Sequence, residues 1–142
     1  MQMEKWRILF YETPAGNSPV KDFIRGLSAT KRAATIEEID NLEEFGIMLG
    51  MPHARPLADG IWELRARAAD GLTRVLYFAP GKKRRTFVLL HGVEKDQRTI
   101  SDTDRKTALK RKKDYEKRSC YHERMERISG RADARPGRKS GL

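Results

Sequence analysis

The hydrophobic pattern changes from a helical period to a strand period near Ile61, and this change constrains the fold more than any other feature. Before it, apolar residues recur at helical spacing in two stripes, one from Val20 to Leu27 and one from Ala33 to Phe45. After it, apolar and polar residues alternate, as in a strand with one buried face. A run of helices followed by a run of strands, rather than a regular alternation of the two, predicts an α+β fold.

Turn signals divide the chain into seven elements. We expect a strand at residues 6–10, a helix capped by Ser18, and a second helix starting near Ser28 or Thr30. The glycines and prolines of residues 46–60 indicate a loop. Three strands follow at 61–68, 72–78 and 86–93, and Ser101 or Thr103 begins a last helix. The prediction is an antiparallel sheet with helices packed on one face, in the order strand, helix, helix, strand, strand, strand, helix.

The positive charge lies almost entirely at the C-terminal end. The 142 residues carry a net charge of +10, of which residues 105–142 hold +9. Such a segment suits RNA, DNA, an acidic protein or an anionic membrane, but a solvated helix with a charged tail explains it equally well. The length favours one domain, and we place it at residues 1–118, followed by a basic, flexible tail at 119–142.

Several function classes lack their sequence signals. No apolar run reaches the roughly 20 residues of a membrane span, and the first ten residues do not form a secretory signal, so we expect a cytoplasmic protein without a membrane partner. Cys120 is the single cysteine, and the three histidines lack metal-ligand spacing. We therefore expect no metal and no cofactor. Nucleophile-elbow, Walker and dinucleotide-binding glycine patterns are also absent.

Charged residues gather on the sheet face that the helices are expected to leave open. Alternation places them on one side of the strand at 61–68 and across its hairpin, and two more follow on or after the last strand: Glu63, Arg65, Arg67, Arg74, His91 and Lys95. Guanidinium groups bind phosphate oxygens and stabilise the charge of a pentavalent transition state, which suggests a phosphodiester substrate. Cross-strand ion pairs on a solvated face are the structural alternative.

Three segments carry a resemblance to a known family. They are residues 57–65 (LADGIWELR), 74–77 (RVLY) and 89–95 (LLHGVEK), with Asp114-Tyr115 in the helix after them. Together they resemble the HigB-like, phage-derived branch of the RelE superfamily, the toxins of type II toxin–antitoxin modules, over roughly residues 5–117. The resemblance implies a RelE-like fold and a metal-independent endoribonuclease that cuts mRNA, usually on the ribosome. It also implies a helix-turn-helix antitoxin and binding of the toxin–antitoxin complex to operator DNA.

The resemblance also implies the cations of the site. Arg65 matches the arginine that ends the Glu-Leu-Arg motif, Arg74 the one that begins Arg-Val-Leu-Tyr, and Lys95 the first of a lysine pair. The sequence departs from the family pattern at Asp96, in place of the second lysine, and at Ile100, in place of a proline.

Cleavage of RNA needs no protein nucleophile, because the ribose 2′-hydroxyl attacks the adjacent phosphate. We expect Arg74 to stabilise the scissile phosphate and Arg65 to hold the same or an adjacent phosphate. Lys95 either lowers the energy of the departing 5′ oxygen or favours the ionised 2′-hydroxyl. Glu63 or His91 is the candidate general base, since arginine and lysine are ordinarily protonated. Glu63 shares the face of Arg65, whereas His91 alternates with Phe87 and Leu89, so packing in the core is its alternative role. Further RNA contacts are expected from Arg67, Lys82, Lys83, Arg84, Arg85, Arg98, Lys112 and Lys113.

A second hypothesis is a non-catalytic module that binds nucleic acid or a partner through its basic C-terminus. Under the toxin hypothesis, the acidic segments that antitoxins commonly carry would bind the cationic sheet face or its flanking helices.

Overall fold

The computed structural model describes residues 5–81, 85–94 and 99–133, with side chains as far as residue 119. The chain divides into two compact units, residues 1–112 and 113–142. The elements, in order, are β1 (Arg7–Phe10), α1 (Pro19–Arg25), α2 (Ala29–Phe45), the 3₁₀ helix η1 (Gly46–Met48), β2 (Ala54–Pro56), β3 (Trp62–Ala68), β4 (Gly71–Phe78), β5 (Thr86–Val93) and α3 (Asp102–Asp133).

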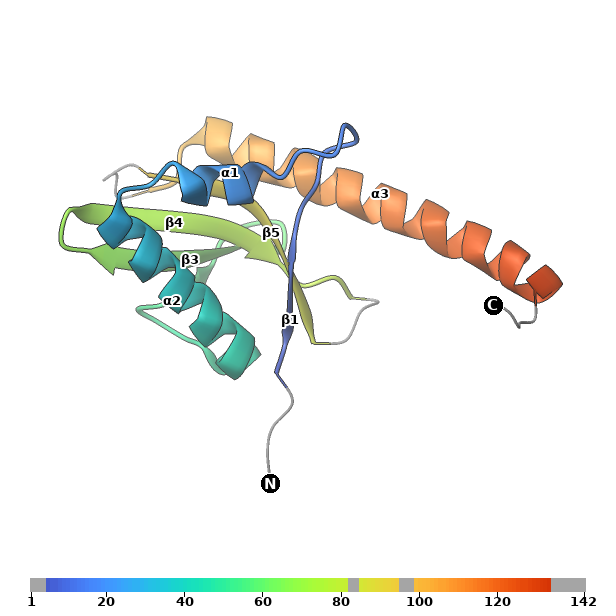
Figure 1. Cartoon of the computed structure of the whole chain (residues 1–142), viewed down its shortest axis with the longest axis horizontal. Coiled ribbons are helices and arrows are strands. Elements are labelled where there is room, and N and C mark those ends of the chain that lie inside the picture. The colour runs from blue at the N-terminus through green and yellow to red at the C-terminus, as the bar shows by residue number, and fades with distance from the viewer. Residues whose placement is uncertain (1–4, 82–84, 95–98, 134–142) are drawn as a thin grey trace, which may run out of the picture. The chain divides into compact units, whose positions relative to one another are not determined.

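Five strands form one sheet in the order β1-β5-β4-β3-β2 (Figure 1). The α+β class predicted from the change of period is confirmed. Two details differ from the prediction. Strand β1 runs parallel to β5, so the sheet is mixed, and β2 pairs with β3 inside the segment expected to be a loop. Three residues that end in a proline carry too little alternation to reveal a strand.

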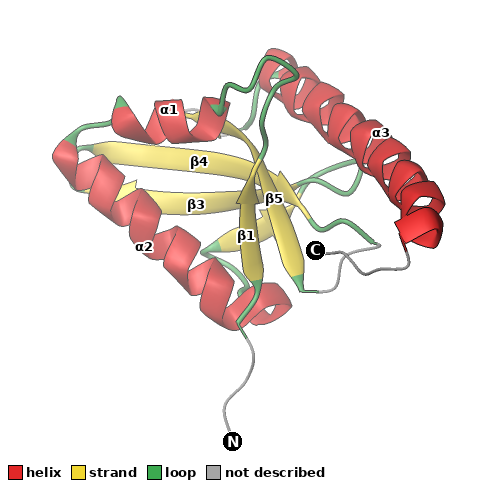
Figure 2. Ribbon diagram, turned by 45° about the vertical axis from the view of Figure 1, so that its right-hand side comes forward, coloured by secondary structure: helices red, strands yellow, loops and turns green. Residues whose placement is uncertain are grey.

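Helices α1 and α2 pack against one face of the sheet (Figure 2). Ser28 caps α2 as predicted, because its hydroxyl accepts a hydrogen bond from the Lys31 amide at 3.2 Å. Ser18 precedes α1, but its hydroxyl makes no capping bond. The core between helices and sheet consists of large apolar side chains from all these elements: Val20, Ile24, Ile39, Leu42, Leu49, Ala54, Leu64, Val75, Tyr77, Phe87 and Leu89.

The opposite face of the sheet holds the charged residues. Along each strand, successive side chains point to opposite faces of the sheet. Glu63, Arg65, Arg74 and His91 alternate with side chains of the core, so the strand register places them on this face. The expectation that the helices leave this face open is wrong for α3, because Asp104 contacts His91 and Arg111 donates to the Leu90 carbonyl. Ser101 begins α3 as predicted, because its hydroxyl accepts a bond from the Asp104 amide at 3.1 Å.

A β-bulge interrupts β5 opposite β4. Leu76 pairs with His91 and the next residue, Tyr77, pairs with Leu89, so Leu90 has no partner on β4. The free Leu90 carbonyl accepts a hydrogen bond from Arg111 of α3 at 2.9 Å. The bulge reverses the alternation of β5 and sends His91 to the charged face rather than to the core.

Helix α3 continues past residue 118 and ends at Asp133. None of the helices in the described part of the chain combines the length and apolarity of a membrane span.

Candidate active site

A buried carboxylate joins two arginines on the charged face. Oε1 of Glu63 accepts a hydrogen bond from Nε of Arg55 at 2.5 Å, and Oε2 lies 3.3 Å from Nε of Arg74. The Glu63 side chain is fully buried and that of Arg74 is 3% exposed, whereas Arg55 is 30% exposed. Burial of a charge is costly unless it is paired, so this carboxylate fixes the position of Arg74 within the sheet.

Arg65 lies directly opposite Arg74 in the β3–β4 ladder. Two cations opposite each other repel, and Glu63, two residues before Arg65 on the same face, supplies the compensating charge. The Arg65 amide bonds the His53 carbonyl at 2.8 Å, which fixes its backbone against the segment before β2. Arg65 is half-buried, so its side chain reaches solvent where Arg74 does not.

His91 makes contacts at both ring nitrogens. Its Nε2 lies 2.7 Å from Oδ1 of Asp104, and its Nδ1 lies 3.3 Å from Nη1 of Arg111. Because the guanidinium can only donate, Nδ1 is an acceptor and Nε2 carries the proton that it donates to Asp104. Ser101 donates to the other Asp104 oxygen at 2.7 Å. The imidazole is thus held in one tautomer with its basic nitrogen at Nδ1.

A comparison with protein families finds a match. The model described as phage derived protein Gp49-like (DUF891) matches residues 22–113, more than half of the chain. The chain belongs to the Gp49-like family. This is a RelE/toxin-like family of toxin–antitoxin systems, which indicates a cognate antitoxin as partner. The match includes Glu63, Arg65, Arg74 and His91. A search of curated proteins finds no match.

The Gp49-like chain brings four of the five predicted catalytic residues onto one face: Glu63, Arg65, Arg74 and His91. Lys95 lies outside the described residues, as do four of the predicted RNA contacts: Lys82, Lys83, Arg84 and Arg98.

The remaining predicted RNA contacts are scattered. Arg67 is exposed near the β3–β4 turn, and Lys113 is exposed on α3. The Arg85 guanidinium lies 5.6 Å from the centre of the Trp6 ring, and Lys112 Nζ lies 5.3 Å from that of Phe78. These two cations lie over aromatic faces.

Sequence reasoning did not identify Arg55, Asp104 and Arg111 as part of this Gp49-like site. Arg55 lies in the segment expected to be a loop, so no strand period linked it to Glu63. Asp104 follows Ser101 by three residues, which is capping-box spacing, and that pattern offered a signal for its position. Arg111 had no local signal, because its carbonyl partner is created by the bulge.

Two aromatic residues of the β3–β4 hairpin differ in burial. Tyr77 lies in the core, and burial raises the pKa of its hydroxyl well above the ordinary value. Trp62, the first residue of β3, is 37% exposed.

Proposed function

We propose that this Gp49-like protein is a HigB-like toxin of a type II module and acts as a metal-independent endoribonuclease on mRNA at the cytoplasmic ribosome. The observation that carries the proposal is the pair Arg74 and Arg65, directly opposite on adjacent strands, with Arg74 fixed by the buried Glu63. A pair of guanidinium groups suits a phosphodiester, because both can bind phosphate oxygens and stabilise the charge that develops in the transition state.

The proposed reaction is transesterification within the RNA. The 2′ oxygen forms a bond to phosphorus, the bond from phosphorus to the 5′ oxygen breaks, and a cyclic phosphate and a 5′-hydroxyl result. Arg65, the more exposed cation, binds the phosphate from solvent. Arg74 is 2% exposed, so its contact with the phosphate requires neighbouring side chains to move when RNA binds. The departing 5′ oxygen takes up a proton from solvent, and Lys95 lowers the energy of this oxygen or favours the ionised 2′-hydroxyl.

Of the two candidate bases, His91 is favoured over Glu63. Both carboxylate oxygens of Glu63 face arginines, so we assign it to positioning Arg74. His91 has an acidic partner at Nε2 and keeps its acceptor nitrogen at Nδ1, where the 3.3 Å contact with Arg111 is long. His91 therefore takes the proton of the 2′-hydroxyl at Nδ1.

Cleavage of mRNA by the purified protein, with and without ribosomes, tests the proposal. Arg65→Ala removes a cation of the site and leaves no large cavity in the core, because Arg65 is half-buried. We expect the cleavage rate to fall by a factor of about 10²–10³, which is typical of removing one hydrogen-bond donor to the transition state. Arg7→Ala, an exposed arginine of β1, is the control and should retain full activity. Full activity of Arg65→Ala would contradict the assigned site.

One observation favours the non-catalytic alternative. In the part of α3 whose side chains are described, six cations are exposed: Arg105, Lys106, Lys110, Lys113, Lys117 and Arg118. A module that binds through this helix would cleave no RNA under either condition, and its salt-sensitive RNA binding would be unchanged in Arg65→Ala. The same assay therefore separates the two functions.

A further inference from the structure

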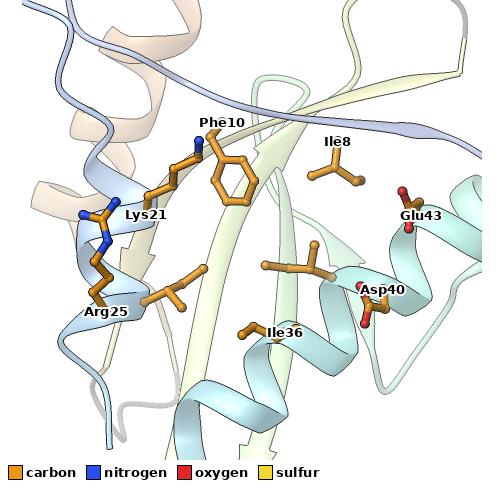
Figure 3. A pocket seen from close by; sticks show the side chains of 9 residues that line it. Ile8, Phe10, Lys21, Arg25, Ile36, Asp40 and Glu43 are labelled. Atoms are coloured by element: carbon orange, nitrogen blue, oxygen red, sulfur yellow. The ribbon is translucent and has the colours of Figure 1, made fainter. Parts of the chain in front are cut away.

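Cavities lie on both faces of the sheet. The larger one, of about 520 Å³, lies between α1, α2 and β1, and Ile8 and Ile36 are among its apolar lining residues (Figure 3). The sheet separates this cavity from Arg65 and Arg74. The smaller one, of about 50 Å³, lies on the charged face, between residues 57–61 and α3. We call it the 57–61 pocket, and it is lined by Leu57, Ala58, Asp59, Ile61, Leu76 and Arg105.

Strand register places the 57–61 pocket beside the proposed active site. Leu76, which lines the pocket, pairs with Glu63 of β3 on one side and with His91 of β5 on the other. Leu76 also follows Arg74 by two residues on β4, so their Cα atoms are about 7 Å apart and their side chains share a face. A nucleotide whose phosphate is bound at Arg65 and Arg74 therefore has its base within reach of the pocket.

The 57–61 pocket is lined by two opposite charges that do not pair with each other. Asp59 lies in the segment before β3, Arg105 lies in the first turns of α3, and both are exposed. In the described part of the chain, the structure gives neither side chain a hydrogen bond or an ion pair. The other lining residues are apolar. A ligand that carries hydrogen-bond donors beside an acceptor would therefore satisfy both charges at once.

The backbone holds Asp59 in a fixed turn. The Leu57 amide donates to the Ile61 carbonyl at 2.7 Å, and the Ile61 amide donates to the Ala58 carbonyl at 3.1 Å. Asp59 itself has a φ of 61°, in the left-handed region that aspartate and asparagine adopt more readily than most residues. The carboxylate is therefore presented from a closed turn rather than from an open loop.

Helix α3 packs against the same turn. Arg105 and Lys112 are seven residues apart and so lie on one side of the helix. A Cβ at Gly60 would lie 3.6 Å from Cε of Lys112, which shows that this side of α3 contacts the turn. The turn and the helix thus hold Asp59 and Arg105 on two sides of one pocket.

We propose that the 57–61 pocket binds the edge of a guanine base of the RNA substrate. A volume of about 50 Å³ admits the edge of a planar ring rather than a whole ligand, so the pocket suits a group on a strand that Arg65 already holds. Guanine presents two adjacent N–H donors to the two oxygens of the Asp59 carboxylate, and its O6 accepts from Arg105. The inference rests on the toxin function proposed above and names the base that its site selects.

The other bases satisfy the two charges less well. Adenine and cytosine offer the Asp59 carboxylate a single amino group, and uracil has a carbonyl on each side of its one N–H. Each of them leaves at least one carboxylate oxygen without a donor. Bases of single-stranded RNA expose these edges, so the pocket can distinguish them.

Binding of short oligonucleotides to the purified protein tests the proposal without relying on cleavage. The probes are fluorescent pentanucleotides with 2′-fluoro sugars, which lack the attacking hydroxyl. They differ only in the central base, which is guanine, adenine, cytosine or uracil. Measured by fluorescence anisotropy, the Kd of the wild type should be at least about tenfold lower for the guanine probe, the discrimination expected of a good bidentate contact.

Two variants test the lining of the pocket. Asp59→Asn removes the paired acceptor oxygens in a residue type that tolerates the positive φ, and Arg105→Ala removes the donor to O6. Each should abolish the preference for guanine. The matched controls are Asp102→Asn and Lys106→Ala, which change an exposed carboxylate and an exposed cation of the same helix and should retain the preference.

Each outcome decides the matter. Equal Kd values for the probes, a preference for another base, or a guanine preference that persists in either pocket variant overturns the proposal. Absence of binding by the wild type at millimolar probe concentration also overturns it. Mapping of cleavage sites on an RNA with 2′-hydroxyl groups separates this result from failure of the toxin function. Guanine-selective binding without cleavage contradicts the endoribonuclease and supports the pocket, whereas cleavage without preference for guanine contradicts the pocket alone.

Discussion

Glu63 and Arg74 form an ion pair across adjacent strands, 3.3 Å from Oε2 to Nε, and neither side chain reaches solvent to any useful extent. A pair of this kind has a large effect when one partner is removed, because the other charge is left in the interior. Arg55 adds a second cation to the same carboxylate from the edge of the sheet. The three side chains therefore act as one unit in stability as well as in the proposed activity.

Substitution of Glu63 by glutamine should destabilise the protein strongly. It leaves the buried Arg74 without its carboxylate, and the free energy of unfolding should fall by about 3–5 kcal/mol. Urea unfolding followed by circular dichroism measures this loss. Arg65→Ala, on the half-buried neighbour, should change the free energy of unfolding by about 1 kcal/mol or less. An equal loss of unfolding free energy in Glu63→Gln and Arg65→Ala would contradict a particular contribution of the Glu63–Arg74 ion pair.

Substitution of Asp104 by asparagine should lower cleavage while the fold is retained. The neutral side chain no longer fixes the proton on Nε2 of His91, so the nitrogen that serves as base is lost in part of the molecules. We expect a rate loss of about a hundredfold, within the range of general-base catalysis. Asp102→Asn, an exposed residue of the same helical turn, is the control. Unchanged cleavage in Asp104→Asn would assign His91 a purely structural role.

The sequence predicted the class of the fold because the period of its apolar residues is explicit. It also placed Glu63, Arg65 and Arg74 together, since they share a hairpin in which alternation holds without interruption. It placed His91 ambiguously, because simple alternation with Phe87 and Leu89 assigns it to the core. The bulge at Leu90 reverses that assignment, and an unpaired residue within a continuous apolar run leaves no local signal.

Asp70 should make stability depend on pH in the acid range. Its carboxylate accepts hydrogen bonds from Ser28 and Thr30, each at 2.6 Å, and these bonds hold its pKa below the ordinary 3.8. The stabilisation is complete above pH 3.8 and is lost as the pH falls through the lower folded-state pKa. Asp70→Asn should therefore lose less stability than the wild type on acidification.

Urea unfolding of wild type and Asp70→Asn between pH 6 and about pH 2.5 measures this difference. Asp59→Asn, in the exposed turn before β3, controls for the loss of one carboxylate. If the free energy of unfolding falls equally with pH in the wild type and in Asp70→Asn, the hydrogen bonds from Ser28 and Thr30 to Asp70 do not contribute to stability.

Removal of residues 119–142 should weaken ribosome binding without unfolding residues 1–112, which form a compact unit of their own. The deletion removes a net charge of +3. Each lost phosphate contact should flatten the plot of log affinity against log salt by roughly one unit. Affinity at several salt concentrations gives the slopes, and cleavage at saturating substrate should persist. Identical slopes would leave the segment without a role in binding.

The bulge at Leu90 has a consequence for how this strand tolerates change in length. Deletion of Leu90 would remove the residue that has no partner on β4, so Leu89 would still face the core and His91 the charged face of a regular strand. Gly92 faces Phe23 of α1, and a Cβ at this position would lie 2.2 Å from the Phe23 ring. A shift of the strand by one residue after the bulge would bring His91 or Val93 to the place of Gly92 and press its side chain into this ring. The end of β5 is therefore held to one register, and Leu90 is the position at which a change of length is tolerated.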